Sequence, residues 1–149
     1  MRFCWLCFLL ALPWLSCGPR TVSLEEFQMR SVTLPNGTEI RTEVMINPID
    51  MERGMMFRDS LPRGRGMLFI HPKPGAYTYW MYQVKIPLDI VWMDANRRIV
   101  EISANAPPCR TRASECPTYG GHEQSQFVLE LGAGEAQRYR LRVGDTLGF

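Results

Sequence analysis

The stretch that decides the fold reads E-R-G-M-M-F-R at 52–58, G-M-L-F at 66–69, Y-W-M at 79–81 and I-P-L-D-I-V-W-M-D at 86–94. Its short apolar segments are closed by Gly, Pro or Asp, which is typical of consecutive strands joined by tight turns. Arg, Asp, Trp and Met fall at the ends of these segments, where a β-domain presents side chains to a ligand. The stretch therefore predicts a β-rich fold, but it names no reaction.

The same pattern continues on both sides of this stretch. Strands are predicted at 31–34, 39–46, 67–70, 77–82, 90–93, 98–103 and 127–131, with a last strand after a turn at 142–145. The Pro-Asn-Gly at 35–37 indicates a hairpin turn between the first two strands. Asn47 and Pro48 predict a short helical turn through Arg53, because Asn caps a helix and Pro fits its first position. A second helical turn is predicted at 134–139.

Short motifs spread over most of the chain carry a family resemblance. They are Glu52-Arg53-Gly54-Met55-Met56-Phe57-Arg58, Leu61-Pro62, Gly66-Met67-Leu68-Phe69, Trp80-Met81, Ile86-Pro87-Leu88-Asp89-Ile90, Val128-Leu129-Glu130-Leu131, Ala133-Gly134 and Val143-Gly144-Asp145. In order and spacing they resemble the bacterial and archaeal domain-of-unknown-function family 192, over roughly residues 32–147. The chain departs from the family at 82–84, where Tyr-Gln-Val replaces a Lys-Asn-Thr-like stretch.

The resemblance implies a single compact domain at 31–149. Its expected architecture is a mainly β, antiparallel sandwich or barrel, similar to a jelly roll, with one or two short helical turns. The family has no settled activity, so the resemblance implies none for this chain. The roles that the Asn and Thr have in relatives are not carried over, because both residues are missing here.

Composition agrees with one globular domain. The 149 residues are 46% hydrophobic and 21% charged, with a formal net charge of +2. A chain of this length is large enough to bury its own core. Basic and acidic residues are interleaved and form no basic stripe that would follow a phosphate backbone, so no nucleic-acid partner is predicted.

The first seventeen residues are predicted to be a signal peptide. Arg2 is followed by an apolar segment at 3–15, which is too short to span a bilayer in the usual way. The end, Trp-Leu-Ser-Cys at 14–17, is similar to a lipoprotein processing site, and it predicts that Cys17 is the lipidated first residue of the mature chain. Residues 18–30 would then be a tether. The alternative is ordinary secretion with a free Cys17.

Cysteine usage fits an oxidising compartment. Once Cys4 and Cys7 are removed with the signal peptide and Cys17 takes the lipid, Cys109 and Cys116 remain as an even pair. In a cell envelope this pair is expected to form a disulfide that closes a small loop. The competing interpretation is a metal site formed by both thiolates and His122, but no fourth ligand is nearby in the sequence.

Three charged residues are candidates for binding or chemistry. Asp89 begins an apolar strand, where a partly desolvated carboxylate can act as an acid or base; alternatively it fixes the loop, either by accepting backbone N–H bonds or by pairing with Arg53 or Arg58. Arg53 and Arg58 flank a Gly-Met-Met turn, and they can clasp a carboxylate or phosphate or form internal ion pairs. Glycoside hydrolysis would need a second acid beside Asp89, such as Asp94 or Glu101.

The aromatic candidates alternate along one predicted strand. Trp80 and Tyr82 face the same side, and an aromatic face beside Arg and Asp is typical of a small-ligand site. Core packing is the other interpretation, and for Trp92, between Val91 and Met93, it is the preferred one. Tyr119 lies in the loop that the disulfide would pin, where it can form a pocket wall.

Other chemistries find little support in the sequence. The methionines are interleaved with Leu, Phe and Ile, which favours core packing over a copper(I) site. Neither His71 nor His122 stands in a recognisable nucleophile motif. Phosphate-binding and dinucleotide motifs are missing, so no cofactor and no metal are predicted.

The sequence thus predicts a monomeric, lipid-anchored domain of the cell envelope, facing the periplasm or the outer surface. It is expected to bind a small ligand or partner without catalysis. The expected ligand-binding residues are Arg53, Arg58, Trp80, Tyr82, Asp89 and Tyr119. The alternative hypothesis is a hydrolase-like enzyme on an envelope glycan, with Asp89 as its acid or base. A third is an assembly factor with no small-molecule site.

Overall fold

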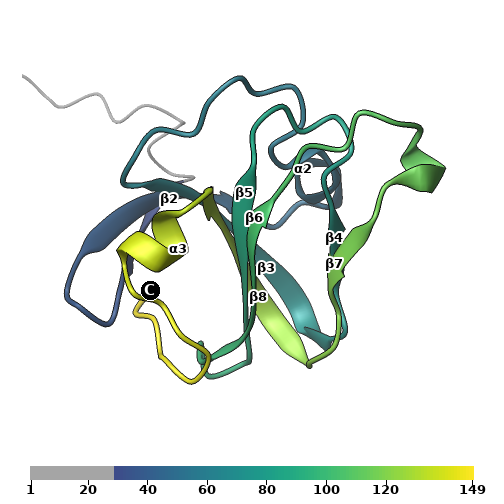
Figure 1. The fold of residues 1–149 in the computed structure, drawn as a ribbon. Coiled ribbons are helices and arrows are strands. Elements are labelled where there is room, and N and C mark those ends of the chain that lie inside the picture. The colour runs from purple at the N-terminus through teal and green to yellow at the C-terminus, as the bar shows by residue number, and fades with distance from the viewer. Residues whose placement is uncertain (1–28) are drawn as a thin grey trace, which may run out of the picture.

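The computed structural model describes residues 29–149, and the fold is shown in Figure 1. The predicted signal peptide, Cys17 and almost all of the predicted tether lie outside the described residues. Within the described part of the chain, no helix is long and apolar enough to cross a membrane.

One mixed sheet of six strands forms the centre of the domain, in the order β1-β2-β3-β8-β5-β6. These strands are β1 (Met29–Thr33), β2 (Glu39–Met45), β3 (Arg65–Gly75), β8 (Ser125–Gly132), β5 (Leu88–Met93) and β6 (Ile99–Ala106). A small second sheet pairs β4 (Thr78–Trp80) with β7 (Thr118–Gly120). The prediction of a mainly β domain is confirmed.

The central sheet differs from the expected antiparallel one at a single pair of strands. β2 and β3 run parallel, with Arg41 opposite Arg65 and Met45 opposite Phe69. A parallel pair needs a long crossover connection, and here the chain between Met45 and Arg65 supplies it and contains a helix. The sheet is open, with β1 and β6 as its edges, and it does not close into a barrel.

The helices are short, as predicted. α2 (Pro48–Arg53) begins where the side chain of Asn47 accepts a hydrogen bond from Ile49 N at 2.9 Å. α3 (Glu135–Arg138) lies within the predicted turn at 134–139. A 3-10 turn, η1 (Ala113–Glu115), lies in the loop closed by Cys109 and Cys116. These two cysteines are joined by a disulfide of 2.03 Å, which the sequence predicted.

Two segments of the chain differ from the prediction. The region at 107–121 is not only a loop, because β7 forms there and pairs with β4. Gly120 permits this, since a Cβ at that position would lie 2.2 Å from Cζ2 of Trp92. The predicted last strand does not form as a full strand. Thr146 and Gly148 make only isolated bridges, to Arg98 and Thr33.

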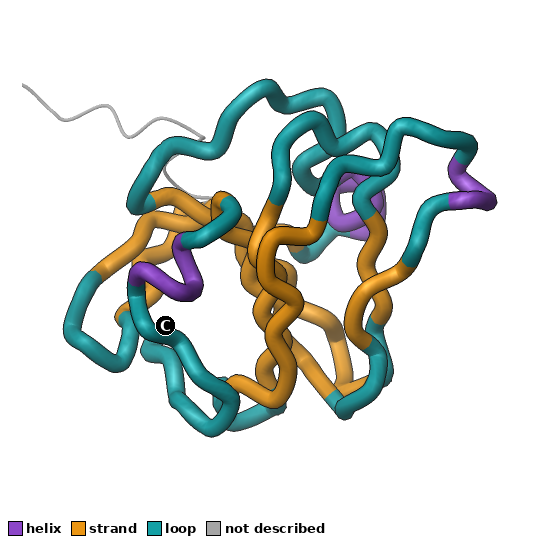
Figure 2. Tube along the Cα trace, viewed as in Figure 1, coloured by secondary structure: helices purple, strands orange, loops and turns teal. Residues whose placement is uncertain are grey.

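Two apolar cores cover the two faces of the central sheet, because successive residues of a strand point to opposite sides. On β5, Ile90 and Trp92 belong to one core, and Val91 and Met93 belong to the other. We call these sides the α2 face and the α3 face. Figure 1 shows α2, β4 and β7 on one side of β5 and β6, and α3 on the other. The tube in Figure 2 shows that, apart from these elements, mostly loops surround the central sheet.

Candidate functional site

A cavity of about 230 Å³ lies on the α2 face of the central sheet. Its wall consists of Met51, Glu52, Arg53, Gly54, Met55, Met56, Phe69, His71, Thr78, Tyr79, Trp80, Val84 and Glu130. We call this cavity the Glu130 cleft. Apolar and aromatic side chains form most of its wall, and a few polar groups converge on it, as in many small-molecule sites.

Local structure brings the wall together from four elements. The end of α2 and the turn at 54–56 form one side, β3 and β8 form the floor, and β4 forms the opposite side. Gly54 has a φ of +41°, and a Cβ there would lie 3.2 Å from the ring of Phe69. The glycine therefore lets the turn after α2 approach the sheet closely.

Glu130 lies at the floor of the cleft and is only 4% exposed. Its neighbours on the adjoining strands are Met67 and Ile90, which are both fully buried and apolar. Its Oε2 atom has no hydrogen-bond partner among the described residues. Burial raises the pKa of Glu130 to about 8, although the charge of Arg58 acts in the opposite direction. The carboxyl group therefore keeps its proton at neutral pH.

The guanidinium group of Arg58 is already engaged by another acid. Its Nη1 and Nη2 atoms donate to the two carboxylate oxygens of Glu43, at 2.6 and 2.7 Å. This bidentate pair raises the pKa of Arg58, chiefly through the hydrogen bond to Glu43. Arg58 thus acts on Glu130 through its charge, while its donors point to Glu43. The predicted alternative of an internal ion pair is the one observed for this arginine.

His71 and Tyr79 are two polar residues of the wall of the cleft. Nε2 of His71 lies 3.1 Å from the hydroxyl oxygen of Tyr79. Burial lowers the pKa of His71, so the ring is neutral at pH 7. Burial, together with the charge of Glu130, raises the pKa of Tyr79, so the phenol keeps its proton. The ring of Tyr77 stacks on His71 with a centroid distance of 3.4 Å, which fixes the orientation of the imidazole.

The structure brings some of the predicted site residues together and separates others. Arg53 and Trp80 both line the Glu130 cleft. Trp80 contacts Tyr82 at a centroid distance of 5.4 Å, but Tyr82 lines a different cavity. Tyr119 packs against the core of the α2 face and lines neither of these two cavities. Trp92 is fully buried in the same core, as the sequence indicated.

Asp89 lies on the α3 face, away from the Glu130 cleft. It is completely buried, and its two oxygens accept hydrogen bonds from the backbone N–H groups of Asn105 and Ala136, each at 2.8 Å. The carboxylate thereby joins β6 and the start of α3 to β5. This is the fixing role that the sequence left open, with backbone amides rather than an arginine as the partners. Asp89 does not meet Arg53 and Trp80 at one rim.

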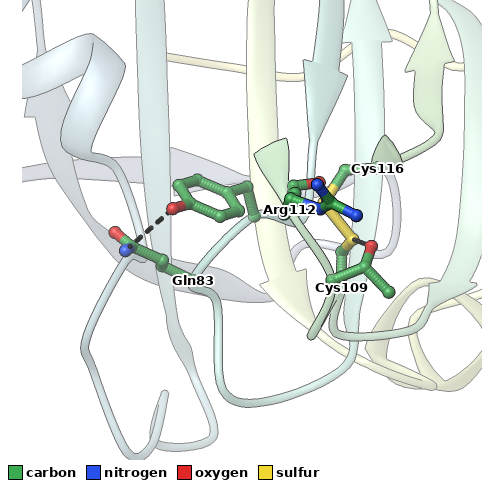
Figure 3. The surroundings of a disulfide bond; sticks show 6 residues. Gln83, Cys109, Arg112 and Cys116 are labelled. Carbon is green, nitrogen blue, oxygen red and sulfur yellow. Dashed lines mark hydrogen bonds between the residues drawn. A yellow bond between two sulfur atoms is a disulfide. The ribbon is translucent and has the colours of Figure 1, made fainter. Parts of the chain in front are cut away.

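A second cavity, of about 550 Å³, lies beside the disulfide. It is lined by Phe57, Tyr82, Gln83, Val84, Lys85, Cys109, Arg110 and Thr111, so Val84 lines both cavities. Figure 3 shows Gln83, whose Nε2 atom donates to the hydroxyl of Tyr82 at 3.2 Å, near the Cys109–Cys116 bond. No buried unpaired polar atom of the described residues lines this cavity.

The described residues contain no group of three or more His, Cys, Asp or Glu side chains placed to hold a metal ion. The thiolate and His122 site does not form, because both sulfurs are in the disulfide. His122 instead lies with Nδ1 2.7 Å from Oε1 of Glu101.

Sequence reasoning missed Glu130, His71 and Tyr79 as site residues. The signal for Glu130 was present, because it is the one acid within the apolar run Val-Leu-Glu-Leu at 128–131. An acid in a strand that is buried on both faces requires a partner or a function. His71 is followed by Pro72 and Pro74, residues typical of a loop, whereas β3 continues through these positions to Gly75.

Two solved structures are similar to this fold. A crystal structure of a protein of unknown function from Novosphingobium aromaticivorans DSM 12444 is 28% identical, with a TM-score of 0.75, and covers 90% of this chain and 94% of its own. A candidate transcription regulator from Sinorhizobium meliloti 1021 is also 28% identical, with a TM-score of 0.70, and covers 79% of this chain and 89% of its own. Comparison with the curated proteins finds no match. The family model of DUF192, described as an uncharacterized ACR, matches residues 31–149.

Proposed function

The chain belongs to domain-of-unknown-function family 192, and we propose that its β-domain binds a small ligand in the Glu130 cleft without catalysing a reaction. The observation that carries this proposal is the carboxyl group of Glu130. It is buried at the floor of a cavity, and its Oε2 atom is left without a partner. A buried polar group without a hydrogen bond costs about 1 to 3 kcal/mol. A ligand that supplies the missing hydrogen bond recovers that free energy.

The walls of the cleft support a ligand with an apolar body. Phe69 is held edge-on to Tyr79, with ring centroids 5.1 Å apart, so this part of the wall is fixed before a ligand arrives. Trp80 is 36% exposed at the mouth and offers an aromatic surface. Preformed walls lose little conformational entropy when a ligand binds, which favours recognition of a small molecule.

The hydrolase alternative has weaker support. It needs Asp89 in a cleft with a second acid, but both oxygens of Asp89 are occupied by backbone N–H groups on the α3 face. A carboxylate held in this way is out of reach of a substrate in the Glu130 cleft, because its side chain lies on the opposite face of the sheet.

We also propose that the domain is held at a membrane of the cell envelope by lipid on Cys17. Support comes from the apolar segment at 3–15 with its terminal Ser-Cys, and from the disulfide, which is typical of an oxidising compartment. Mass spectrometry of the N-terminal peptide of the expressed protein tests this. Diacylglycerol on Cys17, and its loss with release from membranes in Cys17→Ser, is the expected result. An unmodified Cys17 would contradict it.

Ligand binding is tested by a thermal-shift screen of small fragments on the purified full chain. Hits are expected to stabilise the protein, and their effect should disappear in Trp80→Ala. Tyr82→Ala is the matched control, because Tyr82 contacts Trp80 but lines the second cavity. Compounds that still stabilise Trp80→Ala but no longer stabilise Tyr82→Ala would indicate that the ligand binds in the second cavity. A screen without hits would count against a small-ligand role.

A further inference from the structure

We propose that the ligand of the Glu130 cleft is an uncharged carboxamide on an apolar body, and that Glu130 binds the amide as a protonated acid. This inference rests on the proposed function and names the ligand class for the same site. The amide carbonyl would accept a hydrogen bond from Glu130, and the amide N–H would find an acceptor on the same carboxyl group or on Tyr79. No bond is made or broken.

The first argument concerns what Glu130 offers to a ligand. Its side chain lies between Met67 and Ile90, both with no exposed surface, so water does not solvate a charge there. A protonated carboxyl group presents one O–H donor beside one carbonyl acceptor. A carboxamide presents the complementary pair, a carbonyl acceptor and an N–H donor. A carboxamide is therefore a neutral group whose donor and acceptor complement those of the protonated acid.

The second argument concerns charge. A cationic ligand would pair with Glu130 only if the carboxyl group ionised in this low-dielectric site. The positive charge of Arg58, which is close enough to act on the carboxyl group, would also repel such a ligand. An anionic ligand would need a free cation at the floor. Arg58 does not provide one, because Glu43 takes its donors. The rim carries one acid and one base, Glu52 and Arg53, which favours neither sign.

The third argument concerns the polar wall. With its proton on Nδ1, the neutral ring of His71 accepts a hydrogen bond at Nε2 from the Tyr79 hydroxyl. In that arrangement the Tyr79 oxygen keeps its lone pairs for an incoming N–H donor. Met51, Met55 and Phe69 then surround the body of the ligand. Donor, acceptor and apolar walls are thus arranged for an amide.

Three probes of nearly equal size separate the ligand classes: benzamide, benzylammonium and benzoate. Their binding to the full chain is measured by ligand-observed NMR at about pH 6, where Glu130 is protonated. Benzamide is expected to bind at least about tenfold more tightly than either charged probe. Tighter binding of benzylammonium or benzoate, lost in Trp80→Ala, would overturn the ligand class but keep the proposed function. No binding by any probe would overturn both.

Variants of Glu130 then test how the amide is recognised. Glu130→Leu should abolish benzamide binding, because it removes both hydrogen-bonding atoms while keeping an apolar floor. Glu130→Gln retains a donor and an acceptor and should bind benzamide equally at about pH 6 and about pH 9. The affinity of the unmodified protein for benzamide should fall at least about tenfold over that range.

The matched control is Glu135→Gln. Glu135 is also buried and has an unpartnered Oε2, but its Oε1 accepts from Nε of Arg138, and it lies on the α3 face. This variant should bind benzamide and respond to pH like the unmodified protein. Benzamide binding that persists in folded Glu130→Leu, or that does not change with pH in the unmodified protein, would overturn the proposal.

Discussion

Two buried carboxyl groups lie almost side by side in the central sheet and have opposite surroundings. Asp89 on β5 is paired with Leu131 on β8, and Glu130 on β8 is paired with Ile90 on β5. Their side chains therefore point to opposite faces. Asp89 has two backbone N–H partners, whereas Oε2 of Glu130 has none among the described residues. The comparison shows that burial alone does not mark an acid as a candidate for function. The two acids are both buried, and they differ in whether their oxygens have hydrogen-bond partners.

The difference follows from what covers each face. On the α3 face, the chain turns into α3 directly over β5, and the N–H of Ala136 meets the carboxylate of Asp89. On the α2 face, the turn after α2 and β4 leave a cavity over Glu130 instead of filling it with backbone. One acid thus holds the fold together, and the other lines a cavity.

The largest expected effect is on stability when Asp89 is removed. Asp89→Ala removes the acceptor of two hydrogen bonds, from the N–H of Asn105 and from the N–H of the buried Ala136, which should lower the free energy of unfolding by about 3 to 5 kcal/mol. Asp89→Asn retains one acceptor and should cost roughly half as much. Urea unfolding monitored by circular dichroism measures both. A loss below about 1 kcal/mol for Asp89→Ala would remove the contrast between the two acids.

The next effect is the pH dependence that Glu130 imposes on stability. Its folded-state pKa is about 8, and an unfolded glutamate titrates near 4.3. Between these values the folded state holds a proton that the unfolded state has released. Stability should therefore be fully present below about pH 4 and fall as pH rises toward 8, with a limiting slope of about 1.4 kcal/mol per pH unit.

Glu130→Gln isolates this contribution because glutamine does not titrate. In this variant the fall of stability with pH should lack the contribution of Glu130. Its free energy of unfolding relative to that of the unmodified protein should therefore increase between about pH 5 and pH 8. Urea unfolding at a series of pH values measures the difference. Glu135→Gln serves as the control for replacing a buried glutamate on the α3 face. Parallel stability curves for Glu130→Gln and the unmodified protein would mean that Glu130 is ionised in the folded state.

Much of the fold was accessible from the sequence because local signals are strong there. Asn47 and Pro48 predicted the start of α2, and short apolar segments closed by Gly, Pro or Asp predicted most strands. The parallel pairing of β2 with β3 was not accessible, because register and direction depend on the crossover at 46–64 rather than on either strand. β7 was missed because three residues at 118–120 have too little pattern of their own and are ordered by pairing with β4.

The candidate site was predictable only in part. Arg53 and Trp80 were identified from their positions beside short strands, and both line the cleft. Asp89 and Glu130 could not be assigned to a face of the sheet. β5 and β8 carry apolar residues on both sides, so polar and apolar residues do not alternate along them. Which acid finds backbone partners depends on where α3 turns, and this is a property of the tertiary structure.

The smallest expected effect, and the finest test of the contrast, comes from Arg58. Its charge lowers the pKa of Glu130 against the effect of burial, so Arg58→Gln should raise that pKa further. The unpaired Glu43 would act in the same direction, and the double variant Arg58→Gln with Glu43→Gln separates the two charges. Carbon-13 NMR titration of the labelled glutamate carboxyl groups follows Glu130 directly. Arg53→Gln is the matched control, because Arg53 is exposed at the rim. If both arginine variants shift the pKa of Glu130 equally, the proton on this acid is set by the net charge of the domain rather than by its place beside the Glu43–Arg58 pair.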